Sequence, residues 1–356
     1  MMNNQAKALF GKRSFGKKLN KYLSCLNFYN DSDQATILKI KGETWKEFGM
    51  DIFKRKKVLS ALTGLFLLLA GSSVVAQQQL FNYTQYMDNL TPLNPAYSLL
   101  DKAGSISTLA SKQLIGINGG PTTFLINGNV PFESIDGAAG LIVLNDQLAI
   151  EHETEVNAYF AKAIQLGEED YLAVSLNAGF RNYVANYSGL APTDPTFGND
   201  VRQTKPNVGF GVMYYTTWYY LGLSVPELTI NSLGTASVEN NNNFTNHYYF
   251  AAALLTDVAE DIKFKPATLL SYSSGAPFLA NVSGTFYLKG QLGLGLNYST
   301  DKSLAGIITV NFNGFHVGYS YKFGLASQNL AGVNNATHEV TLSYRFGRGS
   351  SILKLL

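Results

Sequence analysis

The chain has 356 residues, of which 46% are hydrophobic, only 15% are charged and one, Cys25, is a cysteine. Its formal net charge is +2, but residues 77–356 carry 14 basic and 20 acidic residues, a net charge of −6. The positive charge therefore lies ahead of this part, which has no disulfide, no thiolate metal site and no basic surface for nucleic acid.

Residues 1–49 form a basic, poorly patterned segment with nine Lys or Arg against four Asp or Glu. The pattern changes at Met50, where a signal peptide begins. Because signal peptides start at or near the amino terminus, Met50 is interpreted as the true start and residues 1–49 as a mis-assigned start or a long leader.

The signal peptide is predicted over residues 50–76. Four consecutive basic residues at 54–57 precede an apolar run at 58–70, and small residues follow up to Ala76. This order predicts Sec-type export with cleavage after Ala76, so that the mature chain begins at Gln77. The alternative is a membrane anchor, but the apolar run is shorter than the roughly 20 residues that span a bilayer.

Residues 77–102 are expected to form an irregular amino-terminal segment. They contain scattered aromatic residues and two prolines, Pro92 and Pro95, without the alternation of a strand. Prolines and irregular spacing favour an ordered but non-regular path. We expect this segment to pack on or in the barrel that follows.

From residue 103 to Phe346 the chain alternates apolar and polar residues with a period of two, as in a strand with two unlike faces. In 290–299, for example, Leu294 and Leu296 fall on one face and Gly295 and Asn297 on the other. The predicted strands lie near 104–112, 121–130, 137–145, 151–163, 170–184, 206–215, 217–224, 246–256, 264–274, 277–288, 290–299, 302–312, 315–323 and 337–346.

These features predict an all-β fold, a transmembrane antiparallel up-and-down β-barrel of about 14 strands over 103–346. A soluble sandwich would also alternate, but it would not need an export signal or the 21 Tyr and 22 Phe of this chain. Aromatic girdles around an apolar band are typical of outer-membrane barrels, so outer-membrane lipid is the expected surroundings. Residues 347–356 form a carboxy-terminal extension.

The connections agree with this topology when both ends of the barrel domain are periplasmic. Short connections such as Asn313-Gly314, which suits a type I′ turn, join even-numbered to odd-numbered strands. The three longest connections, 185–205, 225–245 and 324–336, join odd-numbered to even-numbered strands. They are therefore expected to face outside the cell.

The sequence offers no positive case for an enzyme or a cofactor. The four histidines are scattered without metal-ligand spacing, and there is no Gly-x-Ser-x-Gly elbow or phosphate-binding loop. We therefore expect no catalytic, cofactor-binding or metal-binding residues.

The ordered stretches outside the strand pattern resemble those of the PorP/SprF family, type IX secretion system membrane proteins of Bacteroidetes-type bacteria. Each stretch is short, and their order along nearly all of the mature chain carries the resemblance. They are Gln85-Tyr86-Met87-Asp88-Asn89, Asn94-Pro95-Ala96-Tyr97, Gly116 to Thr123, Asp194-Pro195-Thr196-Phe197, Ser224-Val225-Pro226-Glu227-Leu228, His247-Tyr248-Tyr249, Lys265-Pro266, Gly318-Tyr319-Ser320-Tyr321 and Thr337-His338-Glu339-Val340.

The chain departs from the family pattern at three places. Leu114 stands where tryptophan is usual, Lys322 stands where aspartate is common, and ten residues follow the final Phe346. The resemblance implies a non-enzymatic role in the outer membrane, assisting the secretion or surface anchoring of one secreted protein. That partner would resemble a gliding adhesin with a C-terminal sorting domain, and other type IX secretion components would be further partners.

Two of the long connections contain family-like stretches, and binding residues concentrate in loops on a rigid scaffold. The candidate partner-binding residues are Asp194, Pro195, Phe197, Pro226 and Glu227. The simpler interpretation of Asp194-Pro195 is a turn. The alternative function is a FadL-like outer-membrane transporter of small apolar molecules, although inward faces rich in Gly, Asn, Ser and Thr do not favour an apolar channel.

Overall fold

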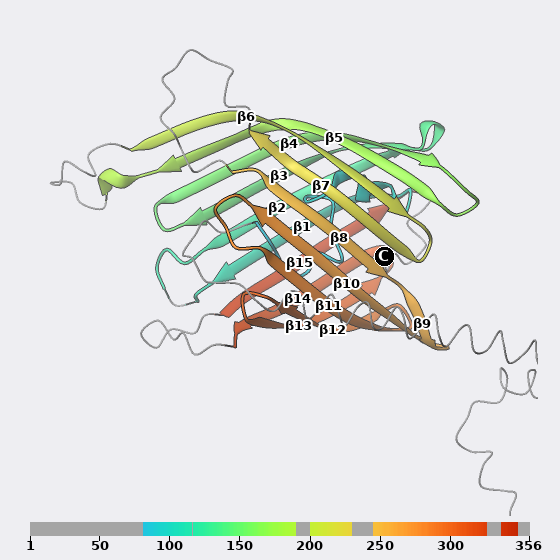
Figure 1. Cartoon of the computed structure of the whole chain (residues 1–356). Coiled ribbons are helices and arrows are strands. Elements are labelled where there is room, and N and C mark those ends of the chain that lie inside the picture. Colours follow the sequence, from blue (N-terminus) through green and yellow to red (C-terminus); the bar gives the residue numbers. More distant parts are fainter. Residues whose placement is uncertain (1–80, 116, 190–199, 230–244, 326–335, 348–356) are drawn as a thin grey trace, which may run out of the picture. The chain divides into compact units, whose positions relative to one another are not determined.

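The computed structural model describes residues 81–115, 117–189, 200–229, 245–325 and 336–347. The predicted signal peptide, the expected new terminus at Gln77 and most of the carboxy-terminal extension lie outside these residues. The described residues form one antiparallel β-barrel with an ordered segment inside it (Figure 1).

The strands are long and follow one another closely along the chain. They are β1 (Gly104–Gln113), β2 (Thr122–Phe132), β3 (Gly137–Leu148), β4 (Glu151–Gln165), β5 (Tyr171–Ala185), β6 (Val201–Tyr215), β7 (Tyr219–Thr229), β8 (His247–Leu254), β9 (Thr256–Ala259), β10 (Ile262–Ser273), β11 (Leu279–Leu288), β12 (Leu292–Ser299), β13 (Ser303–Phe312), β14 (Phe315–Gly324) and β15 (Ala336–Phe346). Three short 3₁₀ helices are η2 (Pro95–Leu99), η3 (Glu133–Ile135) and η4 (Tyr187–Gly189).

The sheet closes on itself. Apart from β8 and β9, strands that are consecutive in the chain pair antiparallel with each other, and β1 pairs with β15 to complete the ring. Both β8 and β9 pair with β10, so the break at Leu255 leaves them as two parts of one barrel strand. The ring therefore has 14 positions, which confirms the predicted strand count. Closure removes the free sheet edges that would otherwise expose unpaired backbone groups.

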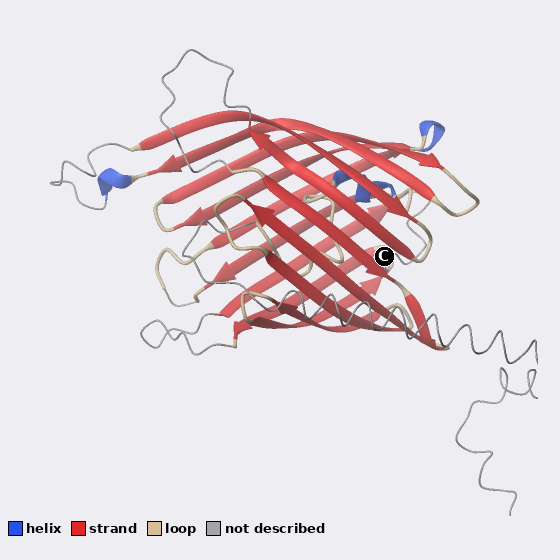
Figure 2. Ribbon diagram, in the orientation of Figure 1, coloured by secondary structure: helices blue, strands red, loops and turns tan. Residues whose placement is uncertain are grey.

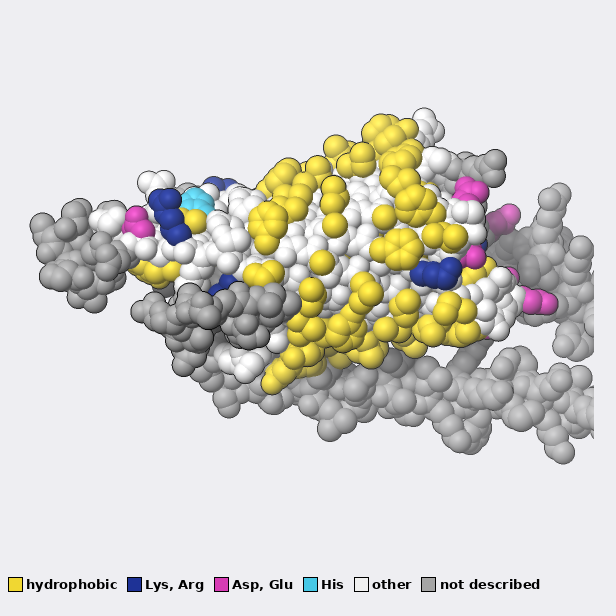
Figure 3. Space-filling view, turned by 90° about the horizontal axis from the view of Figure 1, so that it is seen from above, with side chains coloured by type: hydrophobic (Ala, Val, Ile, Leu, Met, Phe, Trp, Pro, Cys, Tyr) yellow, Lys and Arg dark blue, Asp and Glu magenta, His cyan; other side chains and the backbone are white. Residues whose placement is uncertain are grey.

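Alternate side chains point outward and are apolar. Among the large hydrophobic side chains of the described residues, Leu176 has the highest exposed fraction, 70%. It lies between the outward-facing Phe160 and Phe210 of the neighbouring strands. Seen from above, hydrophobic side chains gather over the middle of the surface and charged ones toward its two ends (Figure 3). An apolar band with polar ends is the surface that a bilayer requires of a barrel. Among the described residues, no helix is long and apolar enough to cross a membrane.

The two ends of the barrel differ in the length of their connections. At one end, here called the turn end, the connections between strands have two to five residues. Asn313 and Gly314 there have φ angles of 47° and 82°, as the predicted type I′ turn requires. The other end, here called the loop end, carries the three longest connections, 186–200, 230–246 and 325–335.

Two strands extend further than the sequence pattern predicted. β6 begins at Val201 rather than near 206, and β7 continues to Thr229 rather than ending near 224. The pairing of β6 with β7 shifts register between Val208 and Phe210, so that β7 bulges at Pro226 and Glu227, which both face the single residue Gly209 of β6. Because proline donates no backbone hydrogen bond, a bulge is where a strand tolerates it.

The amino-terminal segment lies inside the barrel. Residues 81–103, here called the plug, contain η2, which Figure 2 shows in blue within the ring of strands. Within residues 81–100 of the plug, eight tyrosine, methionine, leucine and alanine side chains are at most 5% exposed: Tyr83, Tyr86, Met87, Leu90, Leu93, Ala96, Tyr97 and Leu99. They form one core with inward side chains of the barrel wall. The hydrophobic core of this protein is therefore the plugged lumen.

Candidate functional site

The plug runs through the lumen from the loop end to the turn end. At its start, the Tyr249 hydroxyl donates to the Phe81 carbonyl oxygen at 2.9 Å, and Tyr249 lies two residues into β8 from the loop end. At its end, Asp101 forms an ion pair of 2.8 Å with Arg345, one residue before the end of β15. The two termini of the plug thus lie at opposite ends of the barrel.

Hydrogen bonds from the barrel wall fix the part of the plug nearest the loop end. The Thr84 backbone N–H donates to both carboxylate oxygens of Glu339, at 3.0 and 2.8 Å. Thr341, two residues along β15, donates through its hydroxyl to Gln85 Oε1 at 2.8 Å. Glu339 is only 3% exposed and also accepts from the Ser320 hydroxyl at 3.1 Å. A buried carboxylate that accepts this many bonds holds the chain in one register.

A charged cluster surrounds Asp88 in the middle of the plug. Its Oδ1 accepts from the Tyr287 hydroxyl at 3.1 Å and lies 3.6 Å from Lys265 Nζ. Its Oδ2 lies 3.7 Å from His316 Nε2. Lys265 is 1% exposed and donates to the Met87 carbonyl oxygen at 2.5 Å. The plug therefore supplies the anion, and three strands supply the groups around it.

Asn94 joins the carboxy-terminal half of the plug to β6 and β7. Its Nδ2 donates to the carbonyl oxygens of Val212 and Leu223 at 3.2 and 3.3 Å, while its Oδ1 accepts from the Ala96 N–H as the N-cap of η2. A Cβ on Gly211 would collide with the Asn94 side chain. Glycine at this wall position is required by the close approach of the plug.

Four side chains of the barrel wall form hydrogen bonds with the backbone of the plug at intervals of six residues. Tyr249, Lys265, Ser224 and Tyr215, from four different strands, donate to the carbonyl oxygens of residues 81, 87, 93 and 99. The distances range from 2.5 Å at Lys265 to 3.4 Å at Tyr215. Buried carbonyl groups of an irregular chain need such partners, because no neighbouring strand supplies them.

Two tyrosines of the plug use their hydroxyl groups inside the lumen. Tyr83 donates to the Asn89 carbonyl oxygen within the plug, and the Tyr86 and Ser283 hydroxyls lie 3.1 Å apart and share a hydrogen bond.

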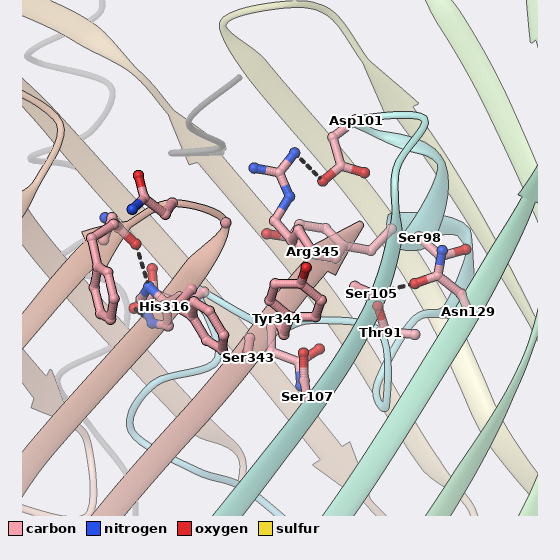
Figure 4. A pocket seen from close by; sticks show the side chains of 18 of the residues that line it. Thr91, Ser98, Asp101, Ser105, Ser107, Asn129, His316, Ser343, Tyr344 and Arg345 are labelled. Carbon is pink, nitrogen blue, oxygen red and sulfur yellow. Dashed lines mark hydrogen bonds and ion pairs between the residues drawn. The ribbon is translucent and has the colours of Figure 1, made fainter. Parts of the chain in front are cut away.

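A polar cavity of about 560 Å³ lies at the turn end, between the plug and the wall. Ser105, Asn129, His316 and Ser343 of the wall line it, and Figure 4 shows Arg345 pointing to Asp101 beside it. The volume suits a small ligand, but the lining is mostly hydroxyl, amide and charged groups. An apolar molecule would gain little by entering it.

A second charged cluster lies in the wall near the loop end. Arg181 of β5 forms ion pairs with Glu153, through Nη2, and with Glu227, through Nη1 at 2.7 Å. Nδ1 of His247 lies 3.7 Å from the same Glu227 carboxylate. Glu155 accepts from the Asn207 amide at 3.1 Å beside them. The cluster carries more acidic than basic groups and lines a small cavity of about 70 Å³ at the mouth.

The base of the connection 186–200 is closed by a side-chain bridge. The backbone N–H and the hydroxyl of Ser188 donate to Asp200 Oδ1 at 3.1 and 2.8 Å. These hydrogen bonds lower the pKa of the exposed Asp200 carboxyl below its ordinary value, because they favour the ionised form. The described residues on the two sides of this connection are thus joined to each other.

The sequence matches one family model over residues 75–344, that of the type IX secretion system membrane protein PorP/SprF. The chain belongs to this family. Its fold is that of an outer-membrane β-barrel, and membership in the type IX secretion system implies association with secretion components. No curated protein sequence matches the chain.

Solved structures with a similar barrel share little sequence with this PorP/SprF protein. CymD, a monoaromatic hydrocarbon channel, is 12% identical with a TM-score of 0.45, and 76% of this chain covers 94% of that one. The toluene transporter TodX of Pseudomonas putida is 11% identical with a TM-score of 0.42, covering 72% and 93%. Omp33 of Acinetobacter baumannii is 9% identical with a TM-score of 0.40, covering 69% and 99%. These identities are too low to indicate shared ligands.

Several of the described stretches that resemble the PorP/SprF pattern meet around the plug. Gln85 contacts the Gly318–Tyr321 stretch, because a Cβ on Gly318 would collide with the Gln85 side chain. Met87 and Asp88 contact Lys265, and Leu93 accepts from Ser224 at 2.6 Å. The sequence indicated each of these stretches separately, but not which of them contact one another in the fold. Their polar residues at inward strand positions were the available signal.

The predicted partner-binding residues separate into two groups. Asp194, Pro195 and Phe197 lie outside the described residues, so their part in binding stays a prediction. Pro226 and Glu227 were placed in a connection, which is wrong: both lie within β7, and Glu227 is 6% exposed in the charged cluster. The β-bulge that they form lets the strand continue through the proline, where the sequence predicted its end.

Proposed function

We propose that this protein assists the secretion or surface anchoring of one specific secreted protein through the type IX secretion system. The partner would be an adhesin-like protein with a C-terminal sorting domain, such as a gliding adhesin. The observation that carries the proposal is a PorP/SprF barrel whose lumen is filled by its own plug. With the lumen filled and the outside apolar, the loop end is the sizeable surface left for recognition.

The FadL-like alternative, a transporter of small apolar molecules, is less well supported. The buried plug residues pack against the wall along the lumen, and most of the residues that line the cavity at the turn end carry hydroxyl, amide or charged groups. An apolar solute would need a continuous apolar path, which these groups interrupt. We therefore place the alternative second.

A non-enzymatic role is part of the proposal. Within the described ranges, no three or more His, Cys, Asp or Glu side chains are placed to hold a metal ion. The buried charged groups instead contact the plug or one another, as Asp88 does with Lys265 and Glu227 with Arg181. Their arrangement supports a structural role in the lumen.

We further propose that the protein reaches the outer membrane through a signal peptide cleaved between Ala76 and Gln77, with outer-membrane lipid around the apolar band. The intact mass of protein from isolated outer membranes tests this. A mass that begins at Gln77 supports it, and a mass that includes residues 1–76 would reject it.

The partner can be sought directly in detergent extracts of the outer membrane. A barrel with an affinity tag is purified from wild-type cells and from cells without a functional type IX translocon, and bound proteins are identified by mass spectrometry. Recovery of one large secreted protein, dependent on the translocon, supports the proposal. A bound lipid or small apolar molecule without a protein partner would favour the transporter.

A further inference from the structure

The first described residues of the plug lie near the loop end of the barrel. Its first described residue, Phe81, accepts a hydrogen bond from Tyr249 near the loop end, and Thr84 is bound by Glu339, three residues after the start of β15. From there the chain passes Lys265, which lies near the turn end of β10. It reaches β1 only at the turn end, where Arg345 holds Asp101. The plug therefore begins at the loop end and ends at the turn end.

The amino end of the plug opens on the mouth at the loop end. Phe81, Asn82 and Tyr83 line the cavity of about 70 Å³ together with wall residues such as Gln113 and Pro121, which flank the connection between β1 and β2. Asn82 is partly exposed, whereas Tyr83 is 3% exposed. The mouth is thus made by the plug and the wall together.

Connection length indicates which side of the membrane this mouth faces. In outer-membrane barrels, turns on the periplasmic side are short and loops on the outside are longer. The turn end has connections of two to five residues, and the loop end has the three longest. The mouth that Phe81 and Asn82 reach is accordingly the outer one.

We infer that the plug is threaded outward through the lumen, so that its first described residues, Phe81 and Asn82, belong to the cell-surface face. This location does not depend on the proposed function. Its use does rest on that function: a secreted protein docking at the loop end would contact this end of the plug. The surface available for recognition then includes Phe81 and Asn82.

The charge of the mouth indicates the chemistry such a partner would present. Asp146, Glu153 and Glu227 line the small cavity beside one arginine, Arg181, and one histidine, His247. A partner segment with lysine or arginine complements this balance better than an acidic one. Any group that enters the cavity contacts the plug, because Asn82 forms part of its lining.

Cysteine labelling can locate the two ends of the plug in intact cells. The chain has one cysteine, Cys25, so Cys25→Ser gives a cysteine-free background. Into it are placed Asn82→Cys at the mouth, Lys102→Cys at the other end of the plug, and Ser274→Cys as an exposed position at the loop end. Cells are treated with a membrane-impermeant maleimide before and after permeabilisation of the outer membrane.

We expect Asn82→Cys and Ser274→Cys to react in intact cells, and Lys102→Cys to react only after permeabilisation. Reaction of Asn82→Cys only after permeabilisation, with Ser274→Cys reacting beforehand, would overturn the inference. Reaction of Lys102→Cys alone in intact cells would show that the turn end faces outward, which overturns it as well.

An epitope inserted between residues 79 and 80 gives a second measurement that does not depend on access of a reagent to the mouth. Antibody binding to intact cells is the expected result, and binding only to lysed cells would overturn the inference. Surface display of the secreted partner is scored in the same cells. Access of the antibody to the epitope on intact cells tests the inference alone. Loss of display while the epitope stays accessible concerns the proposed function, so the two failures are distinguishable.

Discussion

The ammonium group of Lys265 lies 3.6 Å from the Asp88 carboxylate, in an ion pair whose side chains are 1% and 8% exposed. Asp88 belongs to the plug and Lys265 to the wall, 177 residues later in the chain. The same ammonium donates to the Met87 carbonyl oxygen. This pair joins the plug to the barrel at a point where both side chains are buried.

Lys265→Met should loosen the plug, because it leaves Asp88 buried without its cation. Breaking a buried pair by removing one partner costs about 3–5 kcal/mol. We expect a lower thermal unfolding temperature of the purified barrel in detergent, followed by circular dichroism. The double variant Lys265→Met with Asp88→Leu should recover much of the loss, because no charge remains uncompensated. A double variant as unstable as the single one would contradict this account.

Gly211→Val should displace the plug from β6, because its side chain would occupy the space that Asn94 fills. Gly306→Val is the matched control: it is an outward position on β13 with nothing within 4 Å of an added Cβ. We expect Gly211→Val to lower the unfolding temperature and to speed proteolysis within 81–103. Gly306→Val should resemble the wild type. Equal behaviour of the two variants would show that the plug does not require glycine there.

Leu176→Arg should impair assembly of the barrel in the membrane. Leu176 points outward from the long strand β5, and arginine on the lipid face costs about 2–4 kcal/mol near the midplane. Leu176→Phe keeps the site apolar and should assemble normally. The folded fraction is measured by the shift in gel mobility between heated and unheated samples. Normal assembly of Leu176→Arg would mean that this face does not contact lipid.

The strand count, the outward faces and the order of short and long connections could be predicted from the sequence. A two-residue period fixes which side chains share a face, and turn chemistry such as Asn313-Gly314 marks the junctions. The limits of β6 and β7 could not be predicted from the sequence, because the bulge that carries β7 through Pro226 depends on its pairing with β6. Glu227 was assigned to a loop for that reason.

The interior could be predicted only in outline. The irregular segment was expected on or in the barrel, and the structure places its residues 81–103 inside. Its contacts join residues far apart in sequence, such as Thr84 with Glu339, and no local pattern pairs them. The charged cluster around Arg181 was missed because its members come from four separate strands, β4, β5, β7 and β8.

The central claim is that the loop end recognises a secreted protein, and the connection 186–200 is the place to test it. Removing residues 191–198 keeps Ser188, Asp200 and the full length of β6, so the barrel should fold normally. Phe197→Ala tests one candidate anchor within the same segment. A matched control replaces 327–334, in another long connection, with a Gly/Ser linker of equal length.

Surface display of the secreted partner, measured by antibody on intact cells and normalised to the amount of folded barrel, tests the account most directly. We predict that cells without 191–198 keep a folded barrel and lose display, while the 327–334 linker variant retains it. Full display by a folded barrel lacking 191–198 would contradict recognition through this connection.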